Sequence, residues 1–295
     1  MHFRLLQLAL VLTGSVLATA GVAAAGELRV VGTDLLGVDF SKALYGFAGR
    51  HAVPLALALD GSQPGLDRLK SGRADLALVA LPAGGENAMA AFATLTLAYH
   101  RVLVLVPAAS PLAEISLGQL REVFGVTRPV GAMRWGELGL GGEQAASAIV
   151  PHAPAAGAGI AAELFRAVVL PGGDFRPDVG RYDSAEELAP CLAGDTRAIA
   201  LAATLPSDAH ATRIVPVATQ ARGSACLPTP ENLHTGDYPL RLPLRVVFRP
   251  ESRRALQPLL DYLFSDEAAP LLERAGLVPL PAAARRQQRA ALEKP

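Results

Sequence analysis

The 295-residue chain carries 27 basic and 27 acidic side chains, so it has no net charge with which to attract nucleic acid or an anionic membrane surface. Apolar residues make up 51% of it, yet beyond the N-terminus no segment approaches the roughly 18 uninterrupted apolar residues of a spanning helix. The composition therefore predicts a protein that is neither embedded in a membrane nor bound to nucleic acid.

The N-terminus has the pattern of a cleavable signal peptide over residues 1–25. Arg4 gives a positive n-region, Leu5 to Leu17 is largely apolar, and Ala23 to Ala25 offers the small residues that signal peptidase recognises. A membrane anchor is the alternative, but the run is shorter than the roughly 20 residues required and Thr13-Gly14-Ser15 interrupts it. No Cys follows to carry a lipid. We expect a periplasmic protein that begins at Gly26. Its net charge would be near −1, because Arg4 is removed with the signal peptide.

Strand-like and helix-like segments then alternate along the chain, which is typical of an α/β fold. The expected strands are Leu28–Val31, Val53–Leu59, Asp75–Leu81, Leu95–Tyr99, Val102–Val106, Ala198–Ala203, Ile214–Val217 and Leu242–Phe248. The expected helices are Ser41–Gly49, Leu66–Lys70, a helix from Ser116 through Phe124, Ala161–Val169, a helix from Ser184 to near Gly194, and two final helices around residues 265–267, followed by a basic tail at Arg285-Arg286. Ser116 with Gln119, and Ser184 with Glu187, have the spacing of a capping box.

Few residues offer catalytic or metal chemistry. The six histidines form no H-x-x-x-H pair and two cysteines are too few for a metal cluster, so we expect no metal and no cofactor. Ser62 lacks a G-x-S-x-G elbow and no His stands in a triad-like phrase, which favours a binding protein over an enzyme. Paired thiols are the default in an oxidising compartment, but sequence gives no Cα separation. A disulfide between Cys191 and Cys226 and two free thiols both remain open.

A series of short phrases runs through nearly the whole mature chain. They are Gly32-Thr33-Asp34, Gly61-Ser62 with Gly65, the nine residues 69–77 (LKSGRADLA), Ile115-Ser116-Leu117, Trp135-Gly136-Glu137-Leu138, Tyr238-Pro239-Leu240, residues 263–267 (LFSDE) and residues 276–280 (GLVPL). Each phrase alone is weak. In this order and spacing, the chain resembles the phosphate-binding subfamily of periplasmic solute-binding proteins, the receptor subunits of ABC importers.

The resemblance implies a two-lobed periplasmic binding protein fold with two crossing hinge strands. Lobe one would comprise residues 26–107 plus 236–295, and lobe two residues 108–235, with crossings near Val106 and Leu242. A small-molecule or anionic ligand would be gripped between the lobes by hinge closure, and the closed form would be recognised by an inner-membrane ABC permease. We also expect a monomer.

Four segments would contact the ligand. The expected ligand-binding residues are Thr33, Asp34, Leu35, Ser62, Ala80, Gly157 and Gly159. The Thr33 and Ser62 segments keep the family's form, although a plain helix N-cap is the other interpretation of Ser62.

The other two segments depart from the family pattern. Relatives carry an aspartate after the third strand, where this chain has Ala80. They also carry an arginine and Ser-Gly-Thr where this chain reads PAAGAGIA over residues 154–161. Arg128 or Arg134 could substitute from a neighbouring loop.

Losing several charged hydrogen-bond partners lowers affinity by many powers of ten. We therefore expect weak phosphate binding and a ligand that is another anion or a less polar organic molecule. The alternative is a receptor-fold protein without a transport role, acting as a periplasmic partner of a sensor or an envelope assembly.

Overall fold

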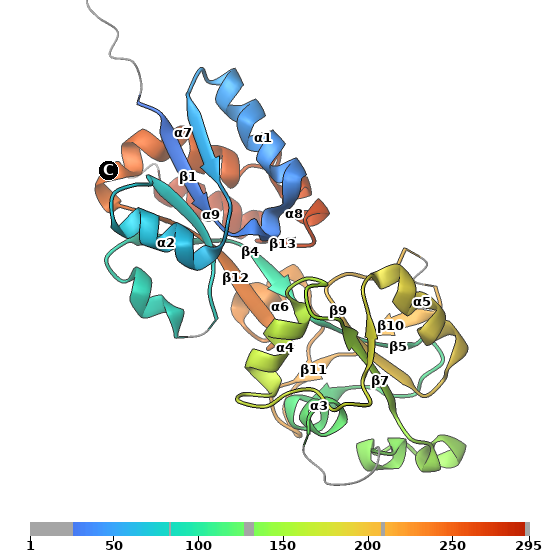
Figure 1. Cartoon of the computed structure of the whole chain (residues 1–295). Coiled ribbons are helices and arrows are strands. Elements are labelled where there is room, and N and C mark those ends of the chain that lie inside the picture. The colour runs from blue at the N-terminus through green and yellow to red at the C-terminus, as the bar shows by residue number, and fades with distance from the viewer. Residues whose placement is uncertain (1–25, 83, 127–132, 208–209, 293–295) are drawn as a thin grey trace, which may run out of the picture.

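The computed structural model describes residues 26–82, 84–126, 133–207 and 210–292, so the expected signal peptide and Arg128 lie outside the described residues. The described chain forms two lobes that meet at a narrow waist (Figure 1). Each lobe contains a mixed sheet with helices packed against it, one sheet of six strands and one of five. The expected two-lobed α/β fold is confirmed.

The first lobe is built on a sheet of strand order β13-β4-β12-β3-β1-β2. The strands are β1 (Leu28–Gly32), β2 (Leu55–Ala58), β3 (Leu76–Ala80), β4 (Ala93–Arg101), β12 (Arg241–Phe248) and β13 (Val278–Pro279). The helices are α1 (Gly37–Arg50), α2 (Ser62–Lys70), α7 (Arg253–Leu263), α8 (Ala269–Arg274) and α9 (Ala282–Leu292), with short 3-10 helices at η1 (Asp34–Leu36), η2 (Gly85–Met89) and η5 (Pro250–Ser252). β1 pairs in parallel with β2 and β3, whereas β12 is antiparallel to β3 and β4. Every residue of β3 is buried, which explains its unbroken apolar sequence.

The second lobe is built on a sheet of strand order β10-β5-β9-β7-β8. The strands are β5 (Leu103–Pro107), β7 (Val150–Pro154), β8 (Gly180–Tyr182), β9 (Ala198–Ala202) and β10 (Thr212–Ile214), with a separate pair, β6 (Ile115–Ser116) and β11 (Val217–Ala218). The helices are α3 (Leu117–Phe124), α4 (Ala161–Val169), α5 (Ala185–Gly194) and α6 (Pro230–Thr235), with 3-10 helices η3 (Trp135–Leu138) and η4 (Gly142–Ala146). The full capping box predicted for Ser116 and Gln119 is present at α3.

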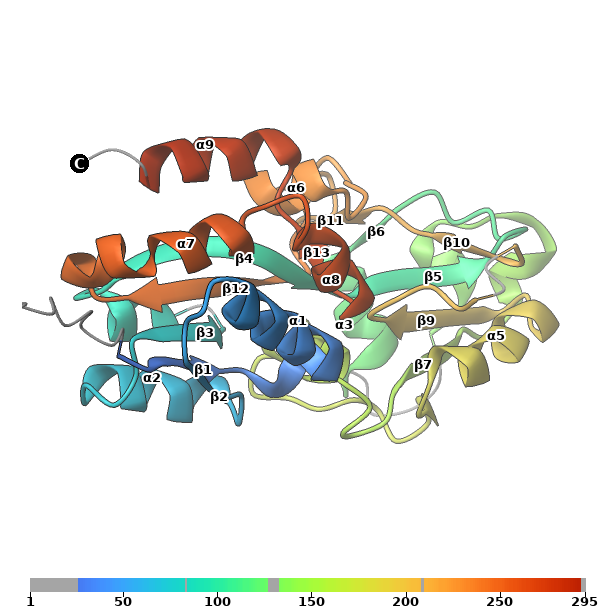
Figure 2. The same cartoon turned by 90° about the horizontal axis from the view of Figure 1, so that it is seen from above.

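Two chain segments cross the waist side by side, as Figure 2 shows for β4 running into β5. The first crossing lies at Val102, not near Val106 as expected, because β5 pairs with β9 and β10 in the second sheet. The second crossing precedes β12, close to the expected Leu242. The Val102 N–H donates to Leu240 O at 3.0 Å, and the Tyr238 hydroxyl donates to Val102 O at 2.6 Å. These bonds join the two crossing segments into a hinge.

Local differences from the sequence prediction have physical causes. The strand expected at Ile214–Val217 is split between β10 and β11, because Pro216 has no N–H with which to continue the ladder. Ser184 caps α5 as expected, but the Glu187 carboxylate accepts from Asp183 N and not from the cap residue. The basic tail at residues 285–286 is part of α9. The strands β7 and β8 and the helix α6 were not predicted.

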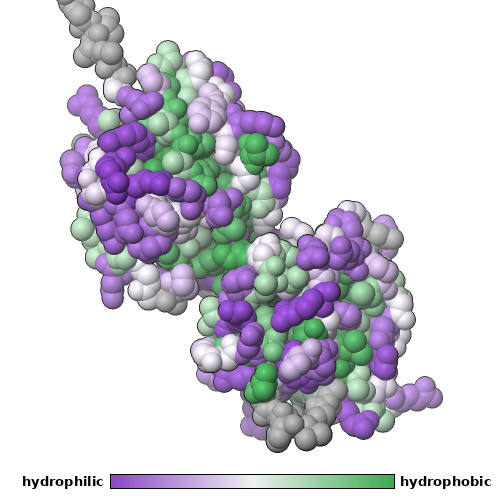
Figure 3. All heavy atoms as spheres, in the orientation of Figure 1, coloured by the Kyte–Doolittle hydropathy of each residue, from purple (hydrophilic) through white to green (hydrophobic). Residues whose placement is uncertain are grey.

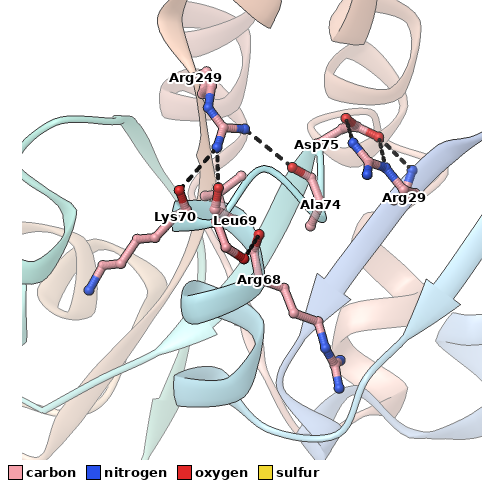
Figure 4. A network of polar contacts seen from close by, with 8 residues as sticks. Arg29, Arg68, Leu69, Lys70, Ala74, Asp75 and Arg249 are labelled. Atoms are coloured by element: carbon pink, nitrogen blue, oxygen red, sulfur yellow. Dashed lines mark hydrogen bonds and ion pairs between the residues drawn. The ribbon is translucent and has the colours of Figure 1, made fainter.

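Polar contacts tie the end of α2 and the segment that leads into β3 to neighbouring parts of the first lobe (Figure 4). The Arg29 guanidinium donates to both carboxylate oxygens of Asp75, at 2.7 and 3.1 Å, which ties β1 to the residue preceding β3. Arg249 follows β12 and donates to Leu69 O, and to Ala74 O at 3.4 Å. Carbonyl groups at the end of a helix have no partner within the helix, so Arg249 satisfies one that α2 exposes. The contacts fix the helix whose other end reaches the site described next.

Candidate functional site

The seven residues expected to bind ligand line one pocket between the lobes. The pocket has a volume of about 390 Å³, and Ile160 and Glu163 complete its wall. Residues 33–35, 62 and 80 belong to the first lobe, whereas residues 157–163 precede and begin α4 of the second. Figure 3 shows the surface narrowing between the two lobes, with hydrophobic residues at the waist end of the first lobe. We call this space the cleft pocket.

The β1 end of the cleft pocket is shaped by two residues. Gly32 has φ 140°, and a Cβ there would lie 1.9 Å from Leu78 O, so only glycine lets β1 turn this close to β3. The buried Thr33 N–H donates to Leu78 O at 2.8 Å, and Thr33 Oγ1 accepts from Leu35 N at 3.3 Å. Thr33 therefore caps η1, and its hydroxyl hydrogen is left to donate to a ligand.

Ser62 is the first residue of α2, and the interpretation of it as an N-cap is wrong. The cap position is Gly61, which makes no side-chain capping bond. Ser62 Oγ accepts instead from Ala80 N at 2.9 Å, which joins the start of α2 to the end of β3. Gly65 allows this close packing, since a Cβ there would lie 2.7 Å from Gly32 Cα. Among the described residues the Ser62 hydroxyl accepts a hydrogen bond but donates none, so its hydrogen is available to a ligand.

The second lobe contributes the N-terminus of α4. Gly157 and Gly159 have φ values of 86° and 101°, a left-handed conformation that favours glycine. The cap residue, Ile160, makes no side-chain capping bond, so the first N–H groups of α4 are left for another acceptor. Helix N-termini carry partial positive charge and suit an acceptor group of a ligand.

The charged groups of the cleft pocket are both acidic. Asp34 and Glu163 are exposed at its edge, and the described residues that line it include no Lys, Arg or His. Arg134, one of the two arginines that could have substituted, does not line the pocket, and its guanidinium donates to Ala146 O. The site thus offers hydroxyl and main-chain donors without a cationic side chain.

A larger space adjoins the cleft pocket at the hinge. It has a volume of about 570 Å³ and is lined by Leu81, Pro82, Glu86, Thr96, Tyr99, Leu164, Ala167, Val168, His234, Pro239, Arg241, Leu242, Pro243 and Arg245. We call it the hinge pocket. It meets the cleft pocket at consecutive residues, Ala80 with Leu81 and Glu163 with Leu164. Its two arginines were not predicted as site residues. The available signal was the alternation of Arg241, Pro243 and Arg245 with leucines, because period two places alternate residues on one strand face.

Several expectations concern residues outside these pockets. Cys191, on α5, and Cys226 both have free thiols, so the disulfide left open by the sequence is not formed. Among the described residues, no group of three or more His, Cys, Asp or Glu side chains could hold a metal ion. In the same part of the chain no helix has the length and apolar character needed to cross a membrane.

Comparison with known proteins agrees with this architecture. A family model described as the PBP superfamily domain matches residues 18–267. No curated protein matches the chain. Similar solved structures include a possible phosphate binding protein from Planctomyces limnophilus, with 19% identity, TM-score 0.69 and coverage of 92% of this chain and 100% of that one. An ABC-type phosphate transport receptor from Vibrio cholerae has 18% identity, TM-score 0.63 and coverage of 86% and 100%. PstS from Borrelia burgdorferi has 14% identity, TM-score 0.71 and coverage of 86% and 99%. At these identities the likeness shows the fold.

Proposed function

The chain belongs to the PBP superfamily, and we propose that it is the exported receptor of an ABC-type importer, capturing a small solute between its lobes. Its superfamily and fold are those of substrate-binding receptors, so it is a binding protein and not an enzyme. The fold relatives named as phosphate transport receptors support the assignment to an importer. Periplasmic localisation agrees with the signal-peptide pattern of residues 1–25.

One observation carries the proposal: residues from both lobes line the same pocket. The first lobe supplies Thr33 and Ser62, and the second supplies the start of α4. A ligand that binds first to one lobe would stabilise the closed arrangement by the contacts it gains with the other. Within the described residues the chain crosses the waist at Val102 and again near Leu240, and these two segments would bend when the lobes close. The closed form is what a permease would recognise.

The charges of the cleft pocket argue against tight phosphate binding. Phosphate needs many donors to replace its hydration, and a charged hydrogen bond contributes about 1.5–3 kcal/mol. The cleft pocket has no cationic side chain among its described lining residues, and Asp34 and Glu163 would repel an inorganic anion. The solute we propose is therefore a small organic molecule with hydrogen-bond acceptors for Thr33, Ser62 and the α4 amides.

Native mass spectrometry of the purified, processed protein tests the proposal. A co-purified small molecule, released on denaturation, is the expected result. The melting temperature should rise with this molecule, since a ligand at 100 times its Kd adds about 2.7 kcal/mol of stability. Ser62→Ala should weaken binding by about 10-fold or less by removing a neutral donor. Ser41→Ala is the matched control, because Ser41 also bonds to backbone, on the exposed face of α1.

Two outcomes would contradict solute capture. One is a protein that co-purifies with nothing and melts at the same temperature with every solute of a broad panel. The other is binding that Ser62→Ala and Ser41→Ala change equally. A stable complex with an envelope protein, combined with an empty cleft, would favour the alternative of a receptor fold reused as a protein partner.

A further inference from the structure

Residues 241–243 and 245 of β12 line the hinge pocket. Arg241, Pro243 and Arg245 line it and are half-buried, whereas Leu244 and Val246 between and beyond them are fully buried in the core. The strand thus presents two cations to a space that the second lobe closes with α4. The hinge pocket therefore has the cationic side chains that the described lining of the cleft pocket lacks.

The two arginines are not equivalent. Arg241 donates to the carbonyl oxygens of Leu233 and His234 near the end of α6, and its guanidinium lies 5.2 Å from the centre of the Tyr99 ring. Its donors on that side are therefore occupied by the protein, although its positive charge still acts on the pocket. Arg241 contributes positive electrostatic potential to the hinge pocket and packs against Tyr99 in the wall of that pocket.

One terminal nitrogen of Arg245 has no hydrogen-bond acceptor within the described part of the chain. Its side chain is 14% exposed, and one terminal nitrogen forms an ion pair with Glu86 at 2.9 Å. The other terminal nitrogen, Nη1, is buried and has no hydrogen-bond partner among the described residues. A buried donor without a partner is unfavourable, and an anionic acceptor that Nη1 meets after a small movement of the Arg245 side chain would satisfy it with a charge-assisted bond. Glu86 is 57% exposed, so the ion pair is open to solvent on the carboxylate side.

The rest of the hinge pocket is mostly apolar and comes from both lobes. Leu81, Pro82 and Pro243 of the first lobe face Leu164 and Val168 on α4 of the second. The volume of about 570 Å³ is within the range of roughly 300–1,000 Å³ usual for organic ligands. Bare phosphate would leave these walls without contacts, whereas an apolar body would cover them.

We infer that the captured solute is an organic anion that spans both pockets: its acidic head binds Arg245 in the hinge pocket, its apolar body lies between α4 and β12, and its other end reaches Thr33 and Ser62 in the cleft pocket. The inference rests on the proposed function of solute capture and names the class of solute. The cationic partner of the ligand is then supplied by the hinge strand, not by the loop before α4. A ligand in this position contacts the hinge directly, so its binding stabilises one arrangement of the lobes.

Isothermal titration calorimetry with paired probes tests the inference. Hexanoate and benzoate carry the acidic head, hexanamide and benzamide are their uncharged counterparts, and inorganic phosphate is a head without a body. Each carboxylate should bind at least about 10-fold more tightly than its amide and than phosphate. Arg245→Gln should remove this difference, whereas Glu86→Gln, which frees Arg245 from its partner, should increase carboxylate affinity. The control is Arg176→Gln: Arg176 has a side chain 10% exposed and an ion pair with Asp178, but it lines neither pocket.

Each outcome decides the inference. It is overturned if carboxylates and amides bind equally, if no carboxylate binds, or if Glu86→Gln leaves carboxylate affinity unchanged. It is equally overturned if Arg245→Gln and Arg176→Gln affect carboxylate binding alike. Because native mass spectrometry reports separately on any co-purified solute, a neutral molecule found there would leave solute capture intact while refuting the anionic class.

Discussion

His100 should make the stability of the protein sensitive to mild acid. It lies on β4 beside the crossing and is 6% exposed, and its Nε2 has no hydrogen-bond partner among the described residues. Burial lowers the pKa of His100 from its ordinary value of 6.5 to about 4. The imidazole is therefore neutral in the folded protein over a pH range in which the unfolded chain becomes protonated.

The size of the effect follows from the difference in pKa between the two states. Above pH 6.5 both states hold His100 neutral and nothing is lost. As the pH falls below 6.5 the unfolded state takes up the proton first, so stability declines until the folded pKa of about 4 is passed. Between pH 8 and pH 5 the loss due to His100 should be about 2 kcal/mol, and below pH 4 it should approach about 3 kcal/mol.

Urea unfolding at pH 8 and pH 5 measures this loss in the wild type and in His100→Leu and His100→Gln. The wild type should lose about 2 kcal/mol more than either variant between the two pH values. Other groups that titrate in this range, including the partly buried His152, contribute equally to all three proteins and cancel in the comparison. Equal losses in the wild type and both variants would refute the assignment of acid sensitivity to His100.

Two further changes test how α2 is held. Gly65→Ala places a methyl group 2.7 Å from Gly32 Cα and should lower the free energy of unfolding, measured with urea, by about 1–3 kcal/mol. The control is Gly49→Ala, whose methyl group would have no neighbour within 4 Å, and which should be neutral or slightly stabilising. Equal effects of the two substitutions would contradict the close packing. Arg249→Met removes the guanidinium donors to Leu69 O and Ala74 O, while the Gly72 N–H still donates to Leu69 O. It should cost about 1 kcal/mol in the same assay, and an unchanged urea midpoint would contradict a stabilising role for Arg249.

Most secondary structure was predictable because it is encoded locally. The capping box at Ser116 and the apolar spacing of α4 are complete within a few residues, and both elements begin and end as predicted. Weaker local signals failed: β7 (Val150–Pro154) contains two prolines and a histidine, and it forms only because β8 and β9 lie on either side of it. Hydrogen bonding to strands distant in sequence stabilises β7, although its own residues do not favour a strand.

The order of short phrases in the sequence, through their resemblance to a receptor family, predicted the two-lobed α/β fold and the seven residues that line the cleft pocket. Within the first lobe the physical reason is that strand ends and helix starts of a parallel sheet meet at one edge. The sequence did not determine the crossing at Val102, since two successive apolar strands, Leu95–Tyr99 and Val102–Val106, give no sign of whether they join the same sheet. Only the tertiary structure brought Arg245 beside α4, a segment some 80 residues earlier in the chain. Whether Arg245 can bind a ligand depends on what lies opposite it, and the opposite wall of the hinge pocket is α4 of the other lobe.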